Sequence, residues 1–263
     1  MARRIKRNQH FEVQIQLKND DFLRTPRADQ RNWTLNRIAK EAAEELLALD
    51  ARAAQFKQGG APLSLHDRTL IELAPDEIME DWQVPIMQAM ADAVTTSHGD
   101  VLEIGYGRGI ASRMIQAGDV RSHTIVDCNP HVLEDCRSWR NQLAGAQIHV
   151  LEGLWQDLEE QFSLYDGILF HAYPLNEQDF AEQVAANATF AGNFFPVAAQ
   201  HLKPGGCFTY FSNEADSLSR AHQRLLLQYF SSFSIHQVRE LSIPDDTKDS
   251  HWLDEMLIVQ AFK

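Results

Sequence analysis

The sequence predicts an α/β fold with a doubly wound, mostly parallel sheet of seven strands. From Asp100 onward, five short apolar segments alternate with segments of helical periodicity, and two more apolar segments follow later in the chain. Strands that alternate with helices in this way form one parallel sheet, and right-handed crossovers place the helices on both of its faces. A glycine-rich turn, "EIGYGRG", directly follows the first apolar segment and marks the edge of the sheet where a ligand is expected.

Each strand is expected where a short apolar run is bounded by turn residues. The seven expected strands are 100–105, 122–129, 147–153, 165–170, 207–212, 233–241 and 252–262. Helical spacing of apolar residues predicts helices at 76–94, with an interruption at Pro85, and at 108–118, 130–144 and 176–202. The segment "LKPGG", residues 202–206, is expected to form a tight turn into the fifth strand.

Residues 1–60 are predicted to form an extension that precedes the main domain at 61–263. Residues 11–18 alternate between apolar and polar side chains, which predicts a half-buried strand. Residues 31–56 repeat apolar side chains at helical spacing, which predicts a long amphipathic helix that ends at Gly59 and Gly60. We expect this extension to act as a lid or as a dimer surface.

Composition excludes several classes of function. The 263 residues carry a net charge of −13 with a pI near 5.2, whereas non-specific nucleic-acid binding needs a basic face. No apolar run approaches the roughly 20 residues of a membrane-spanning helix. The three cysteines are too few for a disulfide framework, which favours a reduced, cytoplasmic protein. No cluster of histidine, cysteine or carboxylate side chains has the spacing of metal ligands, so no metal is expected.

The spacing of the glycine-rich turn favours one nucleotide cofactor over another. Glycines are needed where the backbone turns sharply and approaches a ligand closely. A dinucleotide-binding turn requires its third glycine at position 110, where this chain has Ile110. The pattern present, with Glu103 followed by Gly105, Gly107 and Gly109, fits an S-adenosylmethionine (SAM) site better.

The ends of the next two strands complete the predicted cofactor site. Asp127 ends the second strand and is expected to accept hydrogen bonds from the ribose hydroxyls of an adenosine, or to cap the helix that begins near Pro130. Trp155 follows the third strand, where an aromatic ring either flanks an adenine or belongs to the core. The full predicted cofactor set is Glu103, Gly105, Tyr106, Gly107, Gly109, Ile110, Asp127, Cys128, Asn129, Gly153, Leu154, Trp155 and His171.

The order of these motifs resembles that of the class I SAM-dependent methyltransferases, which have a Rossmann-like sheet. "LEIGYGRG", "IVDCN", "GLWQDL", "DGILF" and "LKPGG" carry this resemblance. "MEDW" at 79–82 and "AYPL" at 172–175 are more specific, and they resemble guanidinoacetate N-methyltransferase and related guanidino methyltransferases. The resemblance extends from Ile78 to the end of the chain and implies SAM as the cofactor, a small-molecule acceptor and a homodimer.

The resemblance also implies which residues meet the methyl acceptor. Glu80 stands where the family places a carboxylate on the guanidinium, and His171 stands where the family has a second carboxylate that accepts the proton. These two are the predicted catalytic residues. The predicted acceptor-binding residues are Glu80, Trp82, His171, Tyr173, Asn213 and Glu214.

This chain has His171 where the resembled family has a carboxylate, and this difference leaves three functions open. The first is N-methylation of a guanidino or other basic nitrogen. The second is O-methylation or ring-N-methylation in natural-product tailoring, since an imidazole with an ordinary pKa near roughly 6.5 accepts a proton without needing a cationic acceptor. The third is a catalytically silent protein that binds SAM. His171 itself is open to a structural interpretation, because histidine is often semi-buried and hydrogen-bonded.

Overall fold

A computed structural model describes residues 79–174, 189–215, 217–244 and 253–263. The predicted extension at 1–60 lies outside the described residues and stays a prediction. The same holds for the first part of the helix expected at 176–202, of which the structure describes residues from 189 onward.

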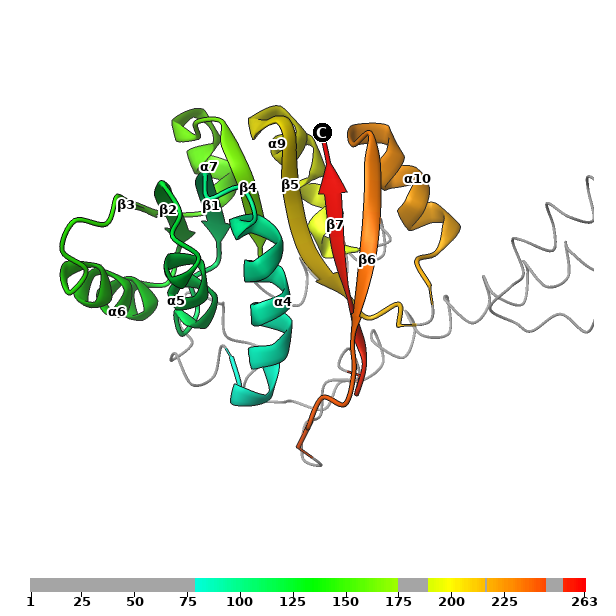
Figure 1. Ribbon diagram of the computed structural model, residues 1–263, viewed down its shortest axis with the longest axis horizontal. Coiled ribbons are helices and arrows are strands. Elements are labelled where there is room, and N and C mark those ends of the chain that lie inside the picture. The colour runs from blue at the N-terminus through cyan, green and yellow to red at the C-terminus, as the bar shows by residue number, and fades with distance from the viewer. Residues whose placement is uncertain (1–78, 175–188, 216, 245–252) are drawn as a thin grey trace, which may run out of the picture. The chain divides into compact units, whose positions relative to one another are not determined.

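The described residues form one sheet of seven strands in the order β3-β2-β1-β4-β5-β7-β6 (Figure 1). The strands are β1 Asp100–Ile104, β2 Ser122–Asp127, β3 Ile148–Glu152, β4 Tyr165–Phe170, β5 Leu202–Ser212, β6 Ser232–Val238 and β7 Met256–Phe262. Strands β1 to β5 are parallel, whereas β7 runs antiparallel between β5 and β6. The predicted doubly wound, mostly parallel α/β sheet is therefore confirmed.

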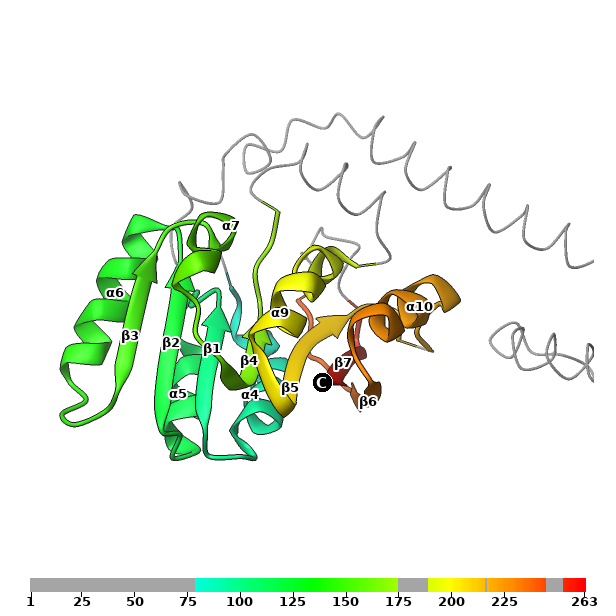
Figure 2. The same ribbon diagram turned by 90° about the horizontal axis from the view of Figure 1, so that it is seen from above.

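Helices cover both faces of this sheet (Figure 2). The helices are η3 Asp81–Gln83, α4 Val84–Thr95, α5 Ile110–Ala117, α6 Pro130–Asn141, α7 Trp155–Leu158, η4 Glu159–Gln161, η5 Phe190–Asn193, α9 Phe195–His201 and α10 Arg220–Tyr229. Helices α4 and α5 lie on one face, and α7, α9 and α10 lie on the other. Successive side chains of a strand point to opposite faces, so Val101 packs with α4 and α5 while Leu102 belongs to the core under α9 and α10.

Two elements differ from their predicted form because of proline and glycine. Pro85 lies in the first turn of α4 and does not interrupt a helix, since a proline at that position has no intrahelical N–H bond to lose. The "LKPGG" segment belongs to β5 itself. Tyr165 is paired with Leu202 and Gly167 with Cys207, so the segment is accommodated as an irregularity in the pairing with β4, and Gly205 takes a φ of 77°.

An ion cluster joins the strands at the amino-terminal edge of the sheet. Lys203 Nζ donates to carboxylate oxygens of Asp100 and Asp166, at 2.7 Å in each case, and Arg121 pairs with both carboxylates. Asp100 and Asp166 lie at the starts of β1 and β4, whereas the glycine-rich turn follows the end of β1. The ion cluster and the turn therefore lie at opposite edges of the sheet. Within the described ranges, no helix is long and apolar enough to cross a membrane.

Candidate functional site

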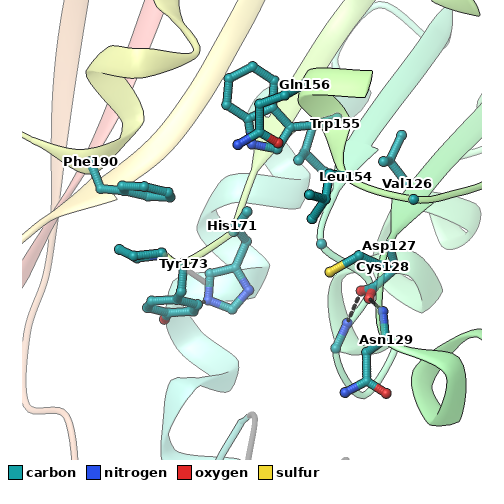
Figure 3. A pocket seen from close by; sticks show the side chains of 16 residues that line it. Val126, Asp127, Cys128, Asn129, Leu154, Trp155, Gln156, His171, Tyr173 and Phe190 are labelled. Carbon is teal, nitrogen blue, oxygen red and sulfur yellow. Dashed lines mark hydrogen bonds between the residues drawn. The ribbon is translucent and has the colours of Figure 1, made fainter. Parts of the chain in front are cut away.

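A pocket lies at the carboxyl ends of β1 to β4, where open α/β sheets bind their ligands. Figure 3 shows His171, Tyr173 and Phe190 on one side of it and Asp127, Cys128 and Asn129 on the other. The pocket is lined by Ile104, Gly105, Gly107, Val126, Asp127, Cys128, Asn129, Gly153, Leu154, Trp155, Gln156, His171, Ala172, Tyr173, Pro174 and Phe190. In the part of the chain that the structure describes, no group of three or more potential ligands is arranged to hold a metal ion.

The glycine-rich turn forms the floor of this pocket and leaves no room for a side chain. Gly105 has a φ of 93°, and a Cβ atom built there would lie 2.2 Å from the carbonyl oxygen of His171. The N–H of Gly105 donates to the carbonyl of Val126 at 2.8 Å, which fixes the turn to β2. A glycine is therefore needed where the turn packs against the end of β4, and this turn also lines the pocket.

Asp127 organises the turn from the end of β2. Its Oδ2 accepts hydrogen bonds from the N–H groups of Tyr106 at 2.8 Å and Gly107 at 3.4 Å, and its Oδ1 accepts one from Asn129 at 2.9 Å. The N–H of Cys128 adds to these donors, so backbone groups fix the orientation of this carboxylate in the pocket lining. Burial raises the pKa of Asp127 above its usual value, and the backbone donors oppose that shift.

Asn129, and not Asp127, caps the following helix. The side-chain oxygen of Asn129 accepts hydrogen bonds from the N–H groups of His131 at 2.9 Å and Val132 at 3.3 Å, at the start of α6. The capping role predicted for Asp127 is therefore wrong. Since the cap is supplied by its neighbour, the carboxylate of Asp127 is directed to the glycine-rich turn and the pocket.

We expect Asp127→Asn to weaken binding of S-adenosylhomocysteine roughly 10- to 100-fold, because hydrogen bonds to a charged group are stronger than those to a neutral amide. Isothermal titration calorimetry measures the affinity. Asp135→Asn on the exposed side of α6 is the matched control and should bind as the unaltered protein does. Equal affinities for the two variants would remove Asp127 from the cofactor site.

Aromatic side chains build the wall above the ends of β3 and β4. Trp155 meets Phe194 edge-on at 5.0 Å between ring centroids and Phe170 at 6.3 Å, so its ring is held in one orientation. Phe190 lies 5.9 Å from Phe170 and also lines the pocket. Phe190 could not be predicted from the sequence, because no local motif marks it, whereas Gln156 belongs to the "GLWQDL" motif and was not predicted.

His171 directly follows β4 and is buried, with 8% of its surface exposed. Burial lowers the pKa of His171 to about 4, so the ring is neutral at physiological pH. Its Nε2 lies 3.1 Å from the hydroxyl of Tyr173, and its ring packs edge-on against Phe211 at 5.5 Å. The structure thus places a neutral imidazole, linked to a phenol, in the wall of the pocket.

The structure brings together most, but not all, of the predicted site residues. Those that line the pocket are Gly105, Gly107, Asp127, Cys128, Asn129, Gly153, Leu154, Trp155, His171 and Tyr173. Those that do not line it are Glu103, Tyr106, Gly109 and Ile110 from the cofactor set, and Glu80, Trp82, Asn213 and Glu214 from the acceptor set.

Glu103 faces away from the pocket, towards α5. It is fully buried, accepts a hydrogen bond from Ser112 Oγ at 2.5 Å and lies 2.9 Å from His123 Nε2. In β1 the neighbouring Ile104 lines the pocket, so the alternation of a strand directs Glu103 to the other face. Its carboxylate joins β1, β2 and α5 behind the glycine-rich turn and does not contact the cofactor pocket.

Tyr106 and Gly109 shape the turn from below. The Tyr106 side chain is buried against Trp139, with ring centroids 5.9 Å apart. A Cβ atom at Gly109 would lie 2.4 Å from the Tyr106 hydroxyl, so the tyrosine covers this glycine closely. Both residues therefore support the turn, and the backbone N–H of Tyr106 reaches Asp127.

The "MEDW" segment lies beside the glycine-rich turn. Trp82 Nε1 donates to Glu80 Oε2 at 3.1 Å. Between them, Asp81 Oδ1 accepts from Arg108 Nη1 at 2.6 Å, and Arg108 belongs to the turn. An exposed ion pair of this kind contributes little stability, about 0–1 kcal/mol. It does tie the predicted acceptor carboxylate to the loop that forms the cofactor site.

Known proteins resemble this chain in sequence and in fold. The sequence model of the family described as guanidinoacetate N-methyltransferase matches residues 50–241. Two similar relatives are proteins named protein arginine N-methyltransferase 2. The one from Yarrowia lipolytica is 30% identical over 158 residues, which is 56% of this chain and 30% of that protein. The one from Saccharomyces cerevisiae is 27% identical over 149 residues, which is 52% of this chain and 33% of that protein.

Among solved structures, a spermidine synthase in complex with the transition-state analogue AdoDATO superposes with a TM-score of 0.50. It is 15% identical, and the match covers 70% of this chain and 61% of that one. At this identity the likeness shows a shared fold.

The relatives correct one expectation, and the family model establishes the family. The chain spans about a third of the length of these curated relatives. Their names state that they methylate arginine in proteins, so the prediction of a small-molecule acceptor is contradicted. The family match covers 50–241 and includes the glycine-rich turn, Asp127 and His171. The chain therefore belongs to the guanidinoacetate N-methyltransferase family, whose described activity is methyl transfer.

Proposed function

We propose that this methyltransferase transfers a methyl group to a guanidino nitrogen of an arginine residue within a protein or peptide. The family supports a guanidino acceptor, and the names of the relatives support arginine in a protein. The observation that carries the proposal is His171, a buried neutral imidazole in the wall of the pocket, linked to Tyr173.

The pocket residues fit a cofactor with an adenosine and an amino-acid tail. The carboxylate of Asp127 lies in the pocket lining and suits ribose hydroxyls, and Leu154, Trp155 and Cys128 offer apolar surface for a base. The backbone at Gly105, where no side chain fits, suits the tail. Bound SAM would supply a methyl group on a sulfonium, from which neutral S-adenosylhomocysteine leaves when the S–CH3 bond breaks.

The side chain of His171 suits proton removal from a guanidinium. A free guanidinium has a pKa above about 12 and its lone pairs are delocalised, so it is a poor nucleophile. One nitrogen has to withdraw its lone pair from the delocalised guanidinium to form the new N–C bond. As it does so, the N–H of that nitrogen becomes strongly acidic. A weak base then suffices, and the proton passes to the imidazole directly or through the Tyr173 hydroxyl at 3.1 Å.

A neutral base also avoids charge repulsion. A protonated imidazole would repel both a cationic acceptor and the sulfonium of SAM, whereas the buried ring of His171 stays neutral above pH 5. The attraction for the guanidinium then has to come from carboxylates. Glu80, held by Trp82 and tied to the glycine-rich turn through Asp81 and Arg108, is our candidate for that role.

We expect the protein to methylate acetyl-Gly-Arg-Gly-amide in the presence of SAM, and to leave acetyl-Gly-Lys-Gly-amide unmodified. The lysine peptide is a matched control, because it carries the same charge on a single tetrahedral nitrogen. Mass spectrometry detects the added methyl group, and fragmentation locates it on the guanidino group. Equal methylation of both peptides, or of neither while S-adenosylhomocysteine still binds, would contradict the proposal.

A further inference from the structure

Three side chains beyond the cofactor pocket form a connected series that the proposed reaction does not use. The Tyr210 hydroxyl lies 2.5 Å from Nε2 of His222, and His222 Nδ1 lies 2.7 Å from Oε2 of Glu214. Tyr210 and His222 are buried, with 1% and 0% of their surfaces exposed. Burying linked polar groups is favourable only when each finds its partner, so this series fixes the carboxylate at its end.

The hydrogen-bonding capacities assign the direction of each bond. An ionised carboxylate only accepts, so Nδ1 of His222 carries the proton and donates it to Glu214. Nε2 of the neutral ring then accepts from the hydroxyl of Tyr210. Ser219 N–H donates to the same Oε2 of Glu214 at 3.1 Å. These donors outweigh burial and hold the pKa of Glu214 below its usual value, so its charge is retained at neutral pH.

The ionised carboxylate lies at the same edge of the sheet as His171. Strands β4 and β5 are parallel, and Phe211 near the end of β5 packs against the rings of His171 and Tyr173. The chain leaves β5 at Ser212, whose Oγ accepts from the N–H of Glu214 at 3.2 Å. Glu214 therefore lies three residues after Phe211, which contacts the proposed base.

The carboxylate of Glu214 is anchored and still partly exposed. The hydrogen bonds from Ser219 N–H and His222 Nδ1 both end on Oε2. The side chain is 24% exposed. An anchored, partly exposed carboxylate presents a fixed negative charge to whatever approaches this edge.

We propose that Glu214, oriented by His222, is a specificity-determining residue that favours arginine acceptors with positively charged neighbours over those with negatively charged neighbours. This inference rests on the proposed function, because it concerns the chain around the reacting guanidino group. Tyr210 and His222 are positioning residues: they act on the acceptor only through the carboxylate that they hold.

The test compares three peptides that differ only in the residues beside arginine: acetyl-Lys-Arg-Lys-amide, acetyl-Gly-Arg-Gly-amide and acetyl-Glu-Arg-Glu-amide. We expect kcat/KM to fall in that order for the unaltered protein. Glu214→Gln should reduce the ratio of kcat/KM between the lysine and glycine peptides by about threefold to eightfold, counting one lysine near the carboxylate. That is the factor for unit charges roughly 7 Å apart at an effective dielectric constant between about 80 and 40. The change should appear mainly in KM, since the charge acts on binding.

Three further variants separate charge from structure. Glu214→Asp keeps the charge and should keep most of the preference. His222→Gln frees the carboxylate and should weaken the preference while kcat for the glycine peptide stays within about twofold, provided that the melting temperature shows a folded protein. Glu160→Gln removes a carboxylate from η4, on the connection that enters β4 at the opposite edge, and should leave the preference unchanged.

Binding measured without turnover keeps this inference separate from the proposed function. Calorimetry with each peptide in the presence of S-adenosylhomocysteine reports the charge preference even if no methyl group is transferred. A Glu214-dependent preference in binding without any methylation would overturn the proposed function and support the inference. Methylation with the same preference in Glu214→Gln and the unaltered protein, or binding of none of the three peptides, would overturn the inference.

Discussion

His171→Asn is expected to lower kcat on the arginine peptide by about 10²- to 10⁴-fold, the contribution of a positioned general base. Asparagine is close to histidine in size and still reaches the Tyr173 hydroxyl, but it accepts no proton near neutral pH. Affinity for S-adenosylhomocysteine should change by less than about threefold, because the pocket contacts made by the backbone at 171 remain. Single-turnover kinetics and calorimetry measure the two quantities separately.

The same residue predicts an unusual pH profile. With the His171 pKa lowered to about 4, the base is in its active, neutral form at every pH well above that value. The rate should therefore be flat between pH 8 and 5 and should fall as the pH drops towards 4. A histidine with an ordinary pKa would instead lose activity near roughly pH 6.5. The positive charges of cofactor and acceptor shift the His171 pKa further in the same direction.

His149→Asn is the matched control for this experiment, because His149 is an exposed histidine on β3. It should leave both the rate and the pH profile unchanged. Unchanged kcat in His171→Asn, with a folded protein and bound cofactor, would remove His171 from the reaction. An equal loss in both variants would point to a general effect of the substitution.

Gly105→Ala is expected to weaken binding of S-adenosylhomocysteine by more than about 100-fold. Two effects combine at this position. Alanine with a φ of 93° is strained by about 1–2 kcal/mol. In addition, its Cβ would lie 2.2 Å from the carbonyl oxygen of His171, so the turn or the end of β4 has to move. Either movement opens the floor of the pocket, and the melting temperature should fall as well.

Gly145→Ala separates these two effects. Gly145 has a similar φ of 89°, but nothing lies within 4 Å of a Cβ atom built there. That variant should show the loss of stability caused by backbone strain alone and should bind S-adenosylhomocysteine normally. If the two variants bind S-adenosylhomocysteine with equal affinity, the close contact between Gly105 and His171 is not required for the cofactor site.

Local patterns predicted the strands and the glycine-rich turn well. The fourth strand was expected at 165–170, and β4 occupies Tyr165–Phe170. Its continuous apolar run and bounding residues identify it without knowledge of its neighbours. The positive φ of Gly105 is likewise a local requirement that only glycine meets readily. The pocket contains both Gly105 and Asp127, which were predicted from their place at strand ends.

Orientation and pairing could not be predicted in the same way. Glu103 ends a strand, as a ligand-binding acid should, but the face to which it points depends on where α5 packs. Glu214 was expected to meet the acceptor because it follows the fifth strand, where the resembled family binds its substrate. Its pairing with His222 joins a loop to a helix face that forms only when α10 packs on the sheet. Such contacts are set by tertiary packing and not by the local sequence.

The backbone contact between Gly105 and residue 171 separates two roles of position 171: its main chain supports the cofactor site, and its side chain faces the proposed acceptor. The main-chain N–H of His171 donates to the Ile104 carbonyl at 2.8 Å, and its carbonyl abuts Gly105. The main chain at position 171 thus holds the glycine-rich turn without using the histidine side chain. A substitution that changes only this side chain therefore leaves these main-chain contacts of the cofactor site in place. At position 171, the backbone holds the cofactor turn, and the side chain determines which group accepts the proton in the proposed reaction.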